Sequence, residues 1–331
     1  MPRTDLADSD RIPGGYDAED EPGVPRLLRS ARWGTVAHED FDPTGQNASR
    51  DPVAGCARET PRVSGVPVVP TLAHAAACLR SESPYLSEAT YPPLDVLKPV
   101  ADGLWVVDSG PLRALGIPLP VRMTVIRLRD GSIWLHSPTR YDPQLHQDIA
   151  ALGPIRHMVA PNIAHWTFLK EWQTQCPDAL TWAAPNLRQR GQVRRSGLRI
   201  DRVLDDAAPP EWAADLRQVV VPGGLSFREV AFFHEASRTL ILTDLVLNLE
   251  PAKMPALLRP LLRLARMTTP DGQPPPYLRL VIRLRRRAAV QAVSEILALR
   301  PERVVFAHGL WFMRDGTAHL RRSLRWLGAF G

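Results

Sequence analysis

The feature that most constrains the fold is an alternation of strand-like and helix-like segments that begins at about residue 96. Short runs rich in β-branched and aromatic residues alternate with segments whose apolar residues recur at helical spacing. The strand-like runs are LWVVD (104–108), RMTVIRL (122–128), SIWLHS (132–137), IRHMVA (155–160), LTWAA (180–184), RQVVV (217–221), REVAFFH (228–234), RTLILTD (238–244) and RVVFAHG (303–309). This alternation predicts an α/β layered domain over residues 96–331.

Turn and cap residues define the connections between these segments. The tripeptides RDG (129–131) and EAS (235–237) each separate two strand-like runs, which predicts two hairpins. Asp142 stands where the N-cap of a helix over 142–152 is expected. Further helices are expected at 165–176, 252–267, 286–299 and 316–328.

The first 95 residues have a different composition. They are rich in Pro, Asp, Gly, Ser and Arg without sustained periodicity, which predicts an irregular, flexible N-terminal extension. The first residues lack the apolar core of a signal peptide, and no run of about 18 apolar residues predicts a transmembrane segment. The three cysteines form no CxxC pair, so neither a cysteine zinc site nor a disulfide framework is expected. Together these features favour a cytoplasmic protein.

Charge is distributed unevenly along the chain, although the net charge is only +6. Residues 1–60 carry 12 acidic and 7 basic residues, whereas residues 253–331 carry 15 basic and 4 acidic residues. A basic region can attract nucleic acid or anionic lipid. Nearly all of its basic residues are arginines, and a high arginine content can also reflect the general amino-acid usage of a genome. We therefore do not expect a nucleic-acid partner. The helix expected at 252–267 either lies on a membrane surface or packs its leucines on the sheet, and we expect the second.

Three segments at the ends of strands carry the residues capable of chemistry. They are APNIAHW (160–166), LILTDLV (240–246) and VVFAHG (304–309). Their order and spacing resemble those of the metallo-β-lactamase superfamily. The amino-acid sequences of these segments are most similar to a branch known only as a domain of unknown function. The resemblance covers residues 96–331 and implies a four-layer αββα sandwich with metal ligands on loops at one edge of two sheets. It implies His165, Asp244 and His308 as candidate metal ligands.

The chain departs from the superfamily pattern at the first metal position. If His165 is the last histidine of the HxHxDH run, then Ala160, Asn162 and Ala164 occupy the other three ligand positions. Gly224 lies near the position of a further ligand histidine. The resemblance therefore implies that the first ion of a binuclear pair has lost its imidazoles, whereas the second site keeps its ligands.

The remaining trio is a legitimate ligand set. Two imidazoles and one carboxylate suit a single zinc or ferrous iron ion with open positions. His136 ends a strand at the same expected edge, and Asn162 offers an amide oxygen, so both are further candidate ligands. Ordinary structural roles remain open for His165 as a residue packed at a helix start and for Asp244 as an N-cap. His308 could equally be a loop histidine bonded to Asp244.

Two functions are consistent with these residues. The first is a metal-dependent hydrolase with a reduced mononuclear site that acts on an ester, thioester, amide or phosphoester of a small molecule. The second is a non-catalytic scaffold or ligand-binding module that has lost its metal site. Glu229, which precedes VAFFH, is expected to be buried with an arginine partner in a structural role. The sequence specifies neither the substrate nor the oligomeric state.

Overall fold

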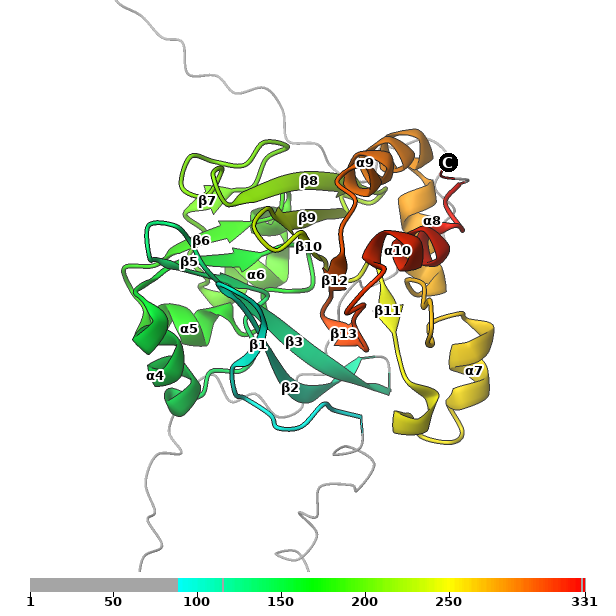
Figure 1. Cartoon of the computed structure of the whole chain (residues 1–331), viewed down its shortest axis with the longest axis horizontal. Helices are drawn as coiled ribbons and strands as arrows, with labels where there is room; N and C mark the ends of the chain where they lie inside the picture. The colour runs from blue at the N-terminus through cyan, green and yellow to red at the C-terminus, as the bar shows by residue number, and fades with distance from the viewer. Residues whose placement is uncertain (1–88, 115, 329, 331) are drawn as a thin grey trace, which may run out of the picture. The chain divides into compact units, whose positions relative to one another are not determined.

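The structure is a computed structural model that describes residues 89–114, 116–328 and 330. The predicted extension, residues 1–95, lies outside the described residues except for 89–95. The described residues carry three sheets (Figure 1). The largest has the order β1 (Lys98–Ala101), β2 (Leu104–Ala114), β3 (Ile117–Arg127), β4 (Ile133–His136), β5 (Ile155–Ala160), β6 (Leu180–Ala183) and β7 (Arg202–Val203).

The second sheet has four strands in the order β12 (Arg303–Val305), β10 (Thr239–Ile241), β9 (Arg228–His234) and β8 (Leu216–Pro222). A short third sheet pairs β11 (Leu247–Asn248) with β13 (His308–Gly309) in parallel. The predicted hairpins are confirmed, because β3 pairs with β4 and β9 pairs with β10 in antiparallel register.

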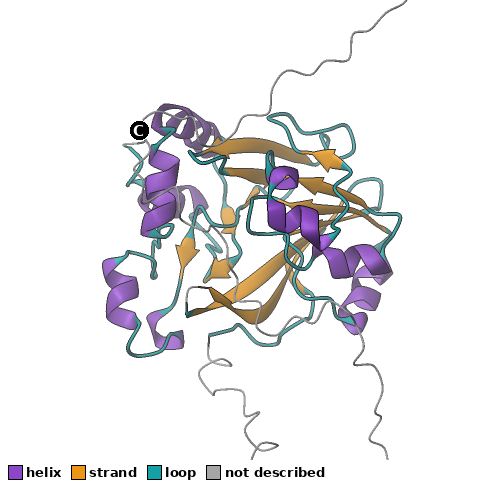
Figure 2. Cartoon of the chain, turned by 180° about the vertical axis from the view of Figure 1, so that it is seen from behind, coloured by secondary structure: helices purple, strands orange, loops and turns teal. Residues whose placement is uncertain are grey.

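Helices cover the outer face of each large sheet, as the two opposite views show (Figures 1 and 2). On the seven-stranded sheet lie α4 (Pro143–Leu152), α5 (Leu169–Gln175) and α6 (Gly191–Ser196), which share one apolar core with β4 and β5. The other side carries α8 (Pro276–Arg283), α9 (Arg286–Ala298) and α10 (Gly316–Leu324), with α9 packed on β8. The Asp142 cap of α4 is confirmed, because its Oδ1 accepts a hydrogen bond from the Leu145 amide at 2.8 Å.

A second core fills the space between the two large sheets. Trp134 of β4 and Trp182 of β6 contribute from the seven-stranded sheet, and Phe232 of β9 contributes from the other. Trp212, from the loop before β8, lies against both tryptophans with ring centroids 6.1 and 4.5 Å away. The layers therefore run helix, sheet, sheet, helix, which is the αββα sandwich that the resemblance implied.

Two predicted helices differ from the structure. The expected helix at 165–176 begins only at Leu169, because the Asn162 side chain accepts bonds from the backbone of residues 164 and 165 and forms a turn there. The expected helix at 252–267 is divided into a short 3-10 turn, Pro251–Lys253, and α7, Arg259–Leu264. Helix α8 was not predicted, because it begins within a proline-rich segment.

The prediction that the leucines of 252–267 pack on the sheet is wrong for three of them. Leu257, Leu261 and Leu264 are 92%, 58% and 82% exposed. Leu262 is 1% exposed and joins a small core with Met254 and Met267. The segment rests on the domain through that small core and turns its other face outward.

Candidate metal centre

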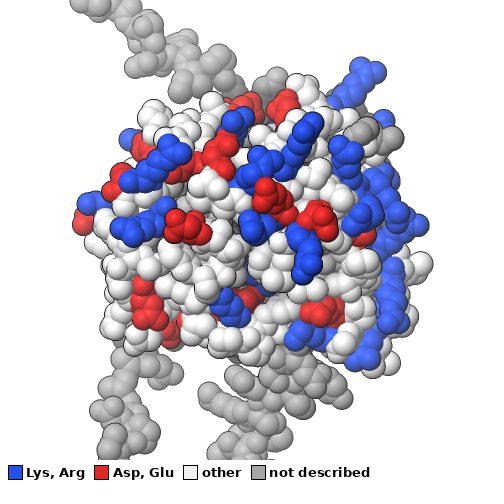
Figure 3. Space-filling model, viewed as in Figure 1, with Lys and Arg blue, Asp and Glu red and all other residues white. Residues whose placement is uncertain are grey.

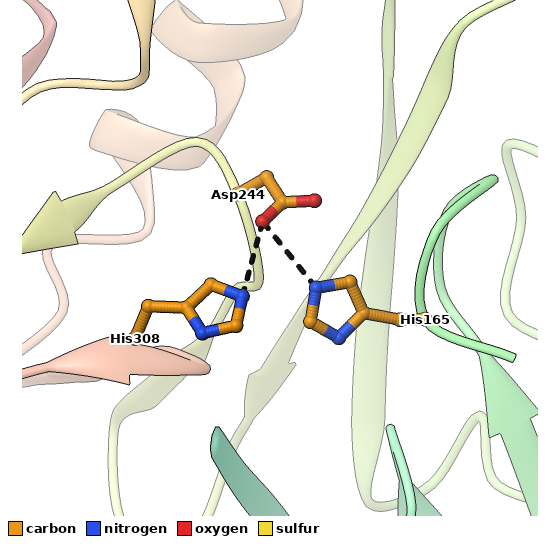
Figure 4. Close-up of side chains that lie close together, drawn as sticks. All are labelled: His165, Asp244 and His308. Carbon is orange, nitrogen blue, oxygen red and sulfur yellow. Dashed lines mark hydrogen bonds and ion pairs between the residues drawn. The ribbon is translucent and has the colours of Figure 1, made fainter. Parts of the chain in front are cut away.

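His165, Asp244 and His308 meet where three strands end. His165 follows β5, Asp244 follows β10, and His308 is the first residue of β13, which follows β12. One ligand atom from each of the three side chains can be chosen so that all lie within 4.8 Å of one another. In the described part of the chain this is the one group of three or more such ligands. Figure 4 shows the imidazoles approaching the carboxylate from two sides.

Both imidazoles face the same carboxylate oxygen. The Nε2 atom of His165 lies 3.3 Å from Oδ1 of Asp244, and Nε2 of His308 lies 3.4 Å from it. Ligands of a tetrahedral zinc ion with bonds of 2.0–2.1 Å are roughly 3.3–3.4 Å apart. The two nitrogen-to-oxygen separations therefore match the ligand spacing around such an ion.

The outer nitrogen of each imidazole is held by a hydrogen bond. Nδ1 of His308 lies 2.8 Å from the Pro120 carbonyl oxygen, and Nδ1 of His165 lies 2.6 Å from Oγ of Ser137. A carbonyl oxygen only accepts hydrogen bonds, so Nδ1 of His308 donates to Pro120 and Nε2 is the ring nitrogen that faces Asp244. Metal-binding histidines in proteins are oriented by outer bonds of this kind.

Arg122 fixes the strand that carries His308. Its Nη1 donates hydrogen bonds to the carbonyls of Phe306 at 2.8 Å and Gly309 at 2.9 Å, on either side of His308 in the chain. The guanidinium is 2% exposed and pairs with Asp108 at 2.6 Å. The sequence analysis missed Arg122, Pro120 and Ser137. Ser137 directly follows the candidate His136 in the segment WLHS, which is the one available signal.

Asn162 connects the loop of His165 to the loop of Asp244. Its Oδ1 accepts the backbone N–H groups of Ala164 at 2.8 Å and His165 at 3.0 Å. Its Nδ2 donates to Oδ2 of Asp244 at 2.7 Å and to Oγ1 of Thr243 at 2.9 Å. The amide oxygen, which we considered as a candidate ligand atom, is therefore occupied by the backbone. The amide nitrogen leaves Oδ1 of Asp244 facing the imidazoles.

Glu229 lies beneath the Asp244 loop, and its partner differs from the one expected. Instead of an arginine, its carboxylate accepts the backbone N–H groups of Thr243 at 2.8 Å, Asp244 at 3.0 Å and Leu245 at 3.3 Å. The residue is fully buried. Burial and the neighbouring Asp244 carboxylate raise the pKa of Glu229 to about 7, against the opposing effect of the backbone bonds. Glu229 therefore shapes the turn that presents Asp244.

The electrostatics of the trio favour an anionic Asp244. Burial by itself raises the pKa of this carboxyl group, but the charges and hydrogen bonds of His165 and His308 outweigh burial and lower the pKa. The side chain is 18% exposed. The space between this charged oxygen and the two ring nitrogens is therefore a suitable place for a cation.

His136 lies beside the trio but is not part of the group that it forms. It is 1% exposed and stacks on Trp134 with ring centroids 5.6 Å apart. Its Nε2 has no hydrogen-bond partner among the described residues. Burial, with a smaller effect from His165, lowers the pKa of His136 to about 3, so this imidazole is neutral. The structure thus places His136 within the core between the sheets.

Two of the positions at which the resemblance implies missing ligands, Ala160 and Gly224, are filled by packing. Ala160 is fully buried in the core beneath α4 and α5. Gly224 lies against Leu284, and a Cβ atom at Gly224 would lie 2.7 Å from the Cβ of Leu284. The first metal position therefore lacks both the ligands and the space for a side chain at residue 224.

Comparison with solved structures confirms the metallo-β-lactamase fold. A metallo-β-lactamase from Pontibacter korlensis is 14% identical, with a TM-score of 0.47, and the match covers 70% of this chain and 97% of the other. Rubredoxin oxygen:oxidoreductase from Desulfovibrio gigas is 11% identical, with a TM-score of 0.51, and a flavoprotein from Thermotoga maritima is 12% identical, with a TM-score of 0.50. The match with the Desulfovibrio gigas protein covers 70% of this chain and 61% of that protein. The match with the Thermotoga maritima flavoprotein covers 69% of this chain and 60% of that protein. At such identities the two matches with TM-scores of 0.50 and 0.51 establish the fold alone.

A comparison with curated proteins finds no match. One family model matches residues 102–274, which is more than half of the chain. The matched segment contains His165 and Asp244, while His308 lies beyond its end. It also contains the Asn162 and Glu229 network that holds the two loops together. The chain belongs to the family described as Domain of unknown function (DUF4336).

Proposed function

We propose that this protein binds one zinc or ferrous iron ion through His165, Asp244 and His308 and is a metal-dependent hydrolase with a mononuclear site. The observation that carries the proposal is the bond between Nδ1 of His308 and the Pro120 carbonyl. It turns Nε2 of His308 toward Oδ1 of Asp244, 3.4 Å away. With the proton on Nδ1, a neutral ring presents a lone pair at Nε2, and a cation between that nitrogen and the carboxylate oxygen would attract both atoms.

The ligand set also fits the chemistry of such an ion. Two imidazole nitrogens and one carboxylate oxygen leave open coordination positions. When bound, the ion would supply a Lewis acid that activates water for attack on an ester, thioester, amide or phosphoester of a small molecule. Asn162 holds Oδ2 of Asp244, so that Oδ1 stays directed at the imidazoles. Ser137 and Pro120 set the rotation of the two rings.

The reduced ligand set distinguishes this proposal from a binuclear enzyme. At the aspartate position of the run stands Ala164, which offers no carboxylate to a second ion or to an attacking water. Any proton transfer would then depend on the substrate, the solvent or Asp244 itself. We therefore expect slower hydrolysis than a binuclear site would give, and a single bound ion.

Metal analysis of the full chain tests the proposal. Protein purified in metal-free buffer, loaded with zinc and desalted, is expected to hold about one ion per chain, whereas His308→Ala and Asp244→Ala variants are expected to hold less than about a tenth of an ion. The matched control is His319→Ala. This change removes another imidazole that is paired with an aspartate, since His319 Nδ1 lies 2.6 Å from Asp271 Oδ1, outside the trio.

The alternative function, a scaffold or ligand-binding module without metal, has one observation in its favour. The trio is closed by its own contacts, because Asp244 faces both imidazoles and also accepts from Asn162. A protonated His165 or His308 would satisfy that carboxylate without an ion. Wild-type protein that holds no zinc after loading, and that has the same metal content as His308→Ala, would support the alternative and contradict the proposed enzyme.

A further inference from the structure

Helix α7 and the turn before it present an exposed row of leucines. Leu257, Leu261 and Leu264 are 92%, 58% and 82% exposed. They are spaced i, i+4 and i+7, which places them on one face of a helical segment. The helix is fastened from behind by the buried Leu262. Because large exposed aliphatic side chains rarely gather in a row on a soluble surface, this row indicates a contact surface.

The same segment is strongly basic. Residues 251–287 contain nine basic residues and one acidic residue, Asp271. Asp271 is already bonded to His319 at 2.6 Å and to Arg322 at 2.7 Å. Arg263 and Arg266 are exposed, and neither has an ion-pair partner within the described residues. Figure 3 shows the Lys and Arg side chains gathered along the edge that α7 and α8 occupy in Figure 1.

Helix α8 extends this surface. It is linked to the end of α7 by the hydrogen bond from Nη2 of Arg279 to the Ala265 carbonyl at 2.8 Å. Leu280 and Leu284, at the exposed side of α8 and its C-terminal end, are 45% and 46% exposed. Arg283 lies between them in the sequence and is exposed as well. We call Leu257, Leu261, Leu264, Arg263 and Arg266 the basic leucine face, with α8 as its neighbour.

We propose that the basic leucine face docks this protein on the surface of an anionic lipid bilayer. Exposed aliphatic side chains on a segment that also exposes cations match the boundary between acyl chains and negatively charged headgroups. A nucleic acid would use the arginines but would leave the leucines in water. No helix in the described part of the chain has the length and apolar character needed to cross a bilayer. The proposal does not depend on metal binding.

Sedimentation of the full chain with lipid vesicles tests this inference. We expect binding to vesicles that contain about one third phosphatidylserine, and much weaker binding to pure phosphatidylcholine vesicles. The variant Leu257→Ser/Leu261→Ser/Leu264→Ser is expected to lose more than about tenfold in affinity, since it removes the apolar contact. The variant Arg263→Glu/Arg266→Glu is expected to lose more than about 25-fold, since each arginine contributes about fivefold.

Matched variants separate this surface from general effects. Val203→Ser changes an exposed apolar residue, 51% accessible, on the distant edge strand β7, and should bind as the wild type does. Arg263→Lys/Arg266→Lys keeps the charge and should also bind. All substituted positions between residues 257 and 266 are exposed, so the variants should remain folded, which circular dichroism checks.

Three outcomes would overturn the inference. The first is equal or absent binding to anionic and neutral vesicles by the wild type. The second is binding that does not need the leucines. It would be seen either as vesicle binding that survives the triple serine change, or as binding to double-stranded DNA that depends on the arginines alone. The third is a wild-type dimer that becomes monomeric in the triple serine variant, because the leucines would then cover a second copy of this chain.

Discussion

The two halves of the metal region contrast sharply within one rim of the fold. In the half formed by the candidate ligands His165, Asp244 and His308, each side chain is oriented by a hydrogen bond. The half at Ala160 and Gly224 has lost its ligands and is closed by side-chain packing. The difference teaches that one rim of the fold holds both a packed and a polar region. We call the packed half at Ala160 and Gly224 the rebuilt half, and the half at His165, Asp244 and His308, whose polar groups are costly to bury unless they are paired, the retained half.

The strongest test of this comparison removes the hydrogen-bond acceptor that holds the Asp244 loop in the retained half. Glu229→Leu would leave three buried backbone N–H groups, those of residues 243–245, without their acceptor. We expect the free energy of unfolding to fall by about 3–5 kcal/mol, because each buried donor left unsatisfied costs about 1–3 kcal/mol. Urea denaturation measures this loss. In Glu229→Gln one acceptor oxygen remains, so a loss of only about 1–3 kcal/mol is expected.

A matched change on the rebuilt half completes this test. Leu284→Ala shortens the 46% exposed side chain that packs on Gly224, and we expect it to cost less than about 1 kcal/mol because the site is partly open to solvent. If Leu284→Ala destabilises the protein as much as Glu229→Leu does, the contrast between a polar retained half and a packed rebuilt half is wrong.

Part of this contrast was accessible from the sequence. The strand ends that carry His165, Asp244 and His308 were recognisable because each follows a short apolar run, and the structure brings these three residues together. The fold followed from the same alternation of strands and helices. These features are local in the chain, so periodicity and turn residues are sufficient to predict them.

The support of the trio was not accessible in the same way. Pro120 meets His308, and Arg122 meets Phe306, across separations of 188 and 184 residues. Such partners depend on which side of β3 faces β13, which no local pattern specifies. The arginine expected for Glu229 was wrong for a similar reason, since backbone N–H groups are present at every residue and give no signal in a sequence. The exposed leucines of α7 were mispredicted because an amphipathic pattern does not say which face is buried.

Restoring the lost ligands would break the comparison if it succeeded. A chain with Ala160→His, Asn162→His, Ala164→Asp and Gly224→His carries the superfamily pattern again. We expect it to bind no second ion and to lose about 3 kcal/mol or more of stability. The reasons are that Ala160 lies in a packed core, that Asn162 links two loops, and that a side chain at Gly224 meets Leu284.

Metal analysis and thermal unfolding measure the two effects together. The single variant Ala164→Asp is the control, because this position is exposed and the change should alter stability by no more than about 0.5 kcal/mol. Two ions per chain at an unchanged melting temperature would show that the rebuilt half still has room for a metal, and the contrast would fail.

The smallest expected effect concerns the outer bond of a single ligand. Ser137→Ala removes the hydroxyl that lies 2.6 Å from Nδ1 of His165 and frees the ring to rotate. Loss of such a partner typically costs about 10–100-fold in metal affinity, and we expect the lower end here because His308 and Asp244 remain held. Competition with a zinc-binding dye measures the affinity. Ser132→Ala is the matched control, since the Ser132 hydroxyl bonds Asp130 at 2.7 Å, away from the trio. Equal affinities in the two variants would mean that His165 is positioned by its backbone alone, and the oriented bonds of the retained half would then be a consequence of the fold without a role in holding an ion.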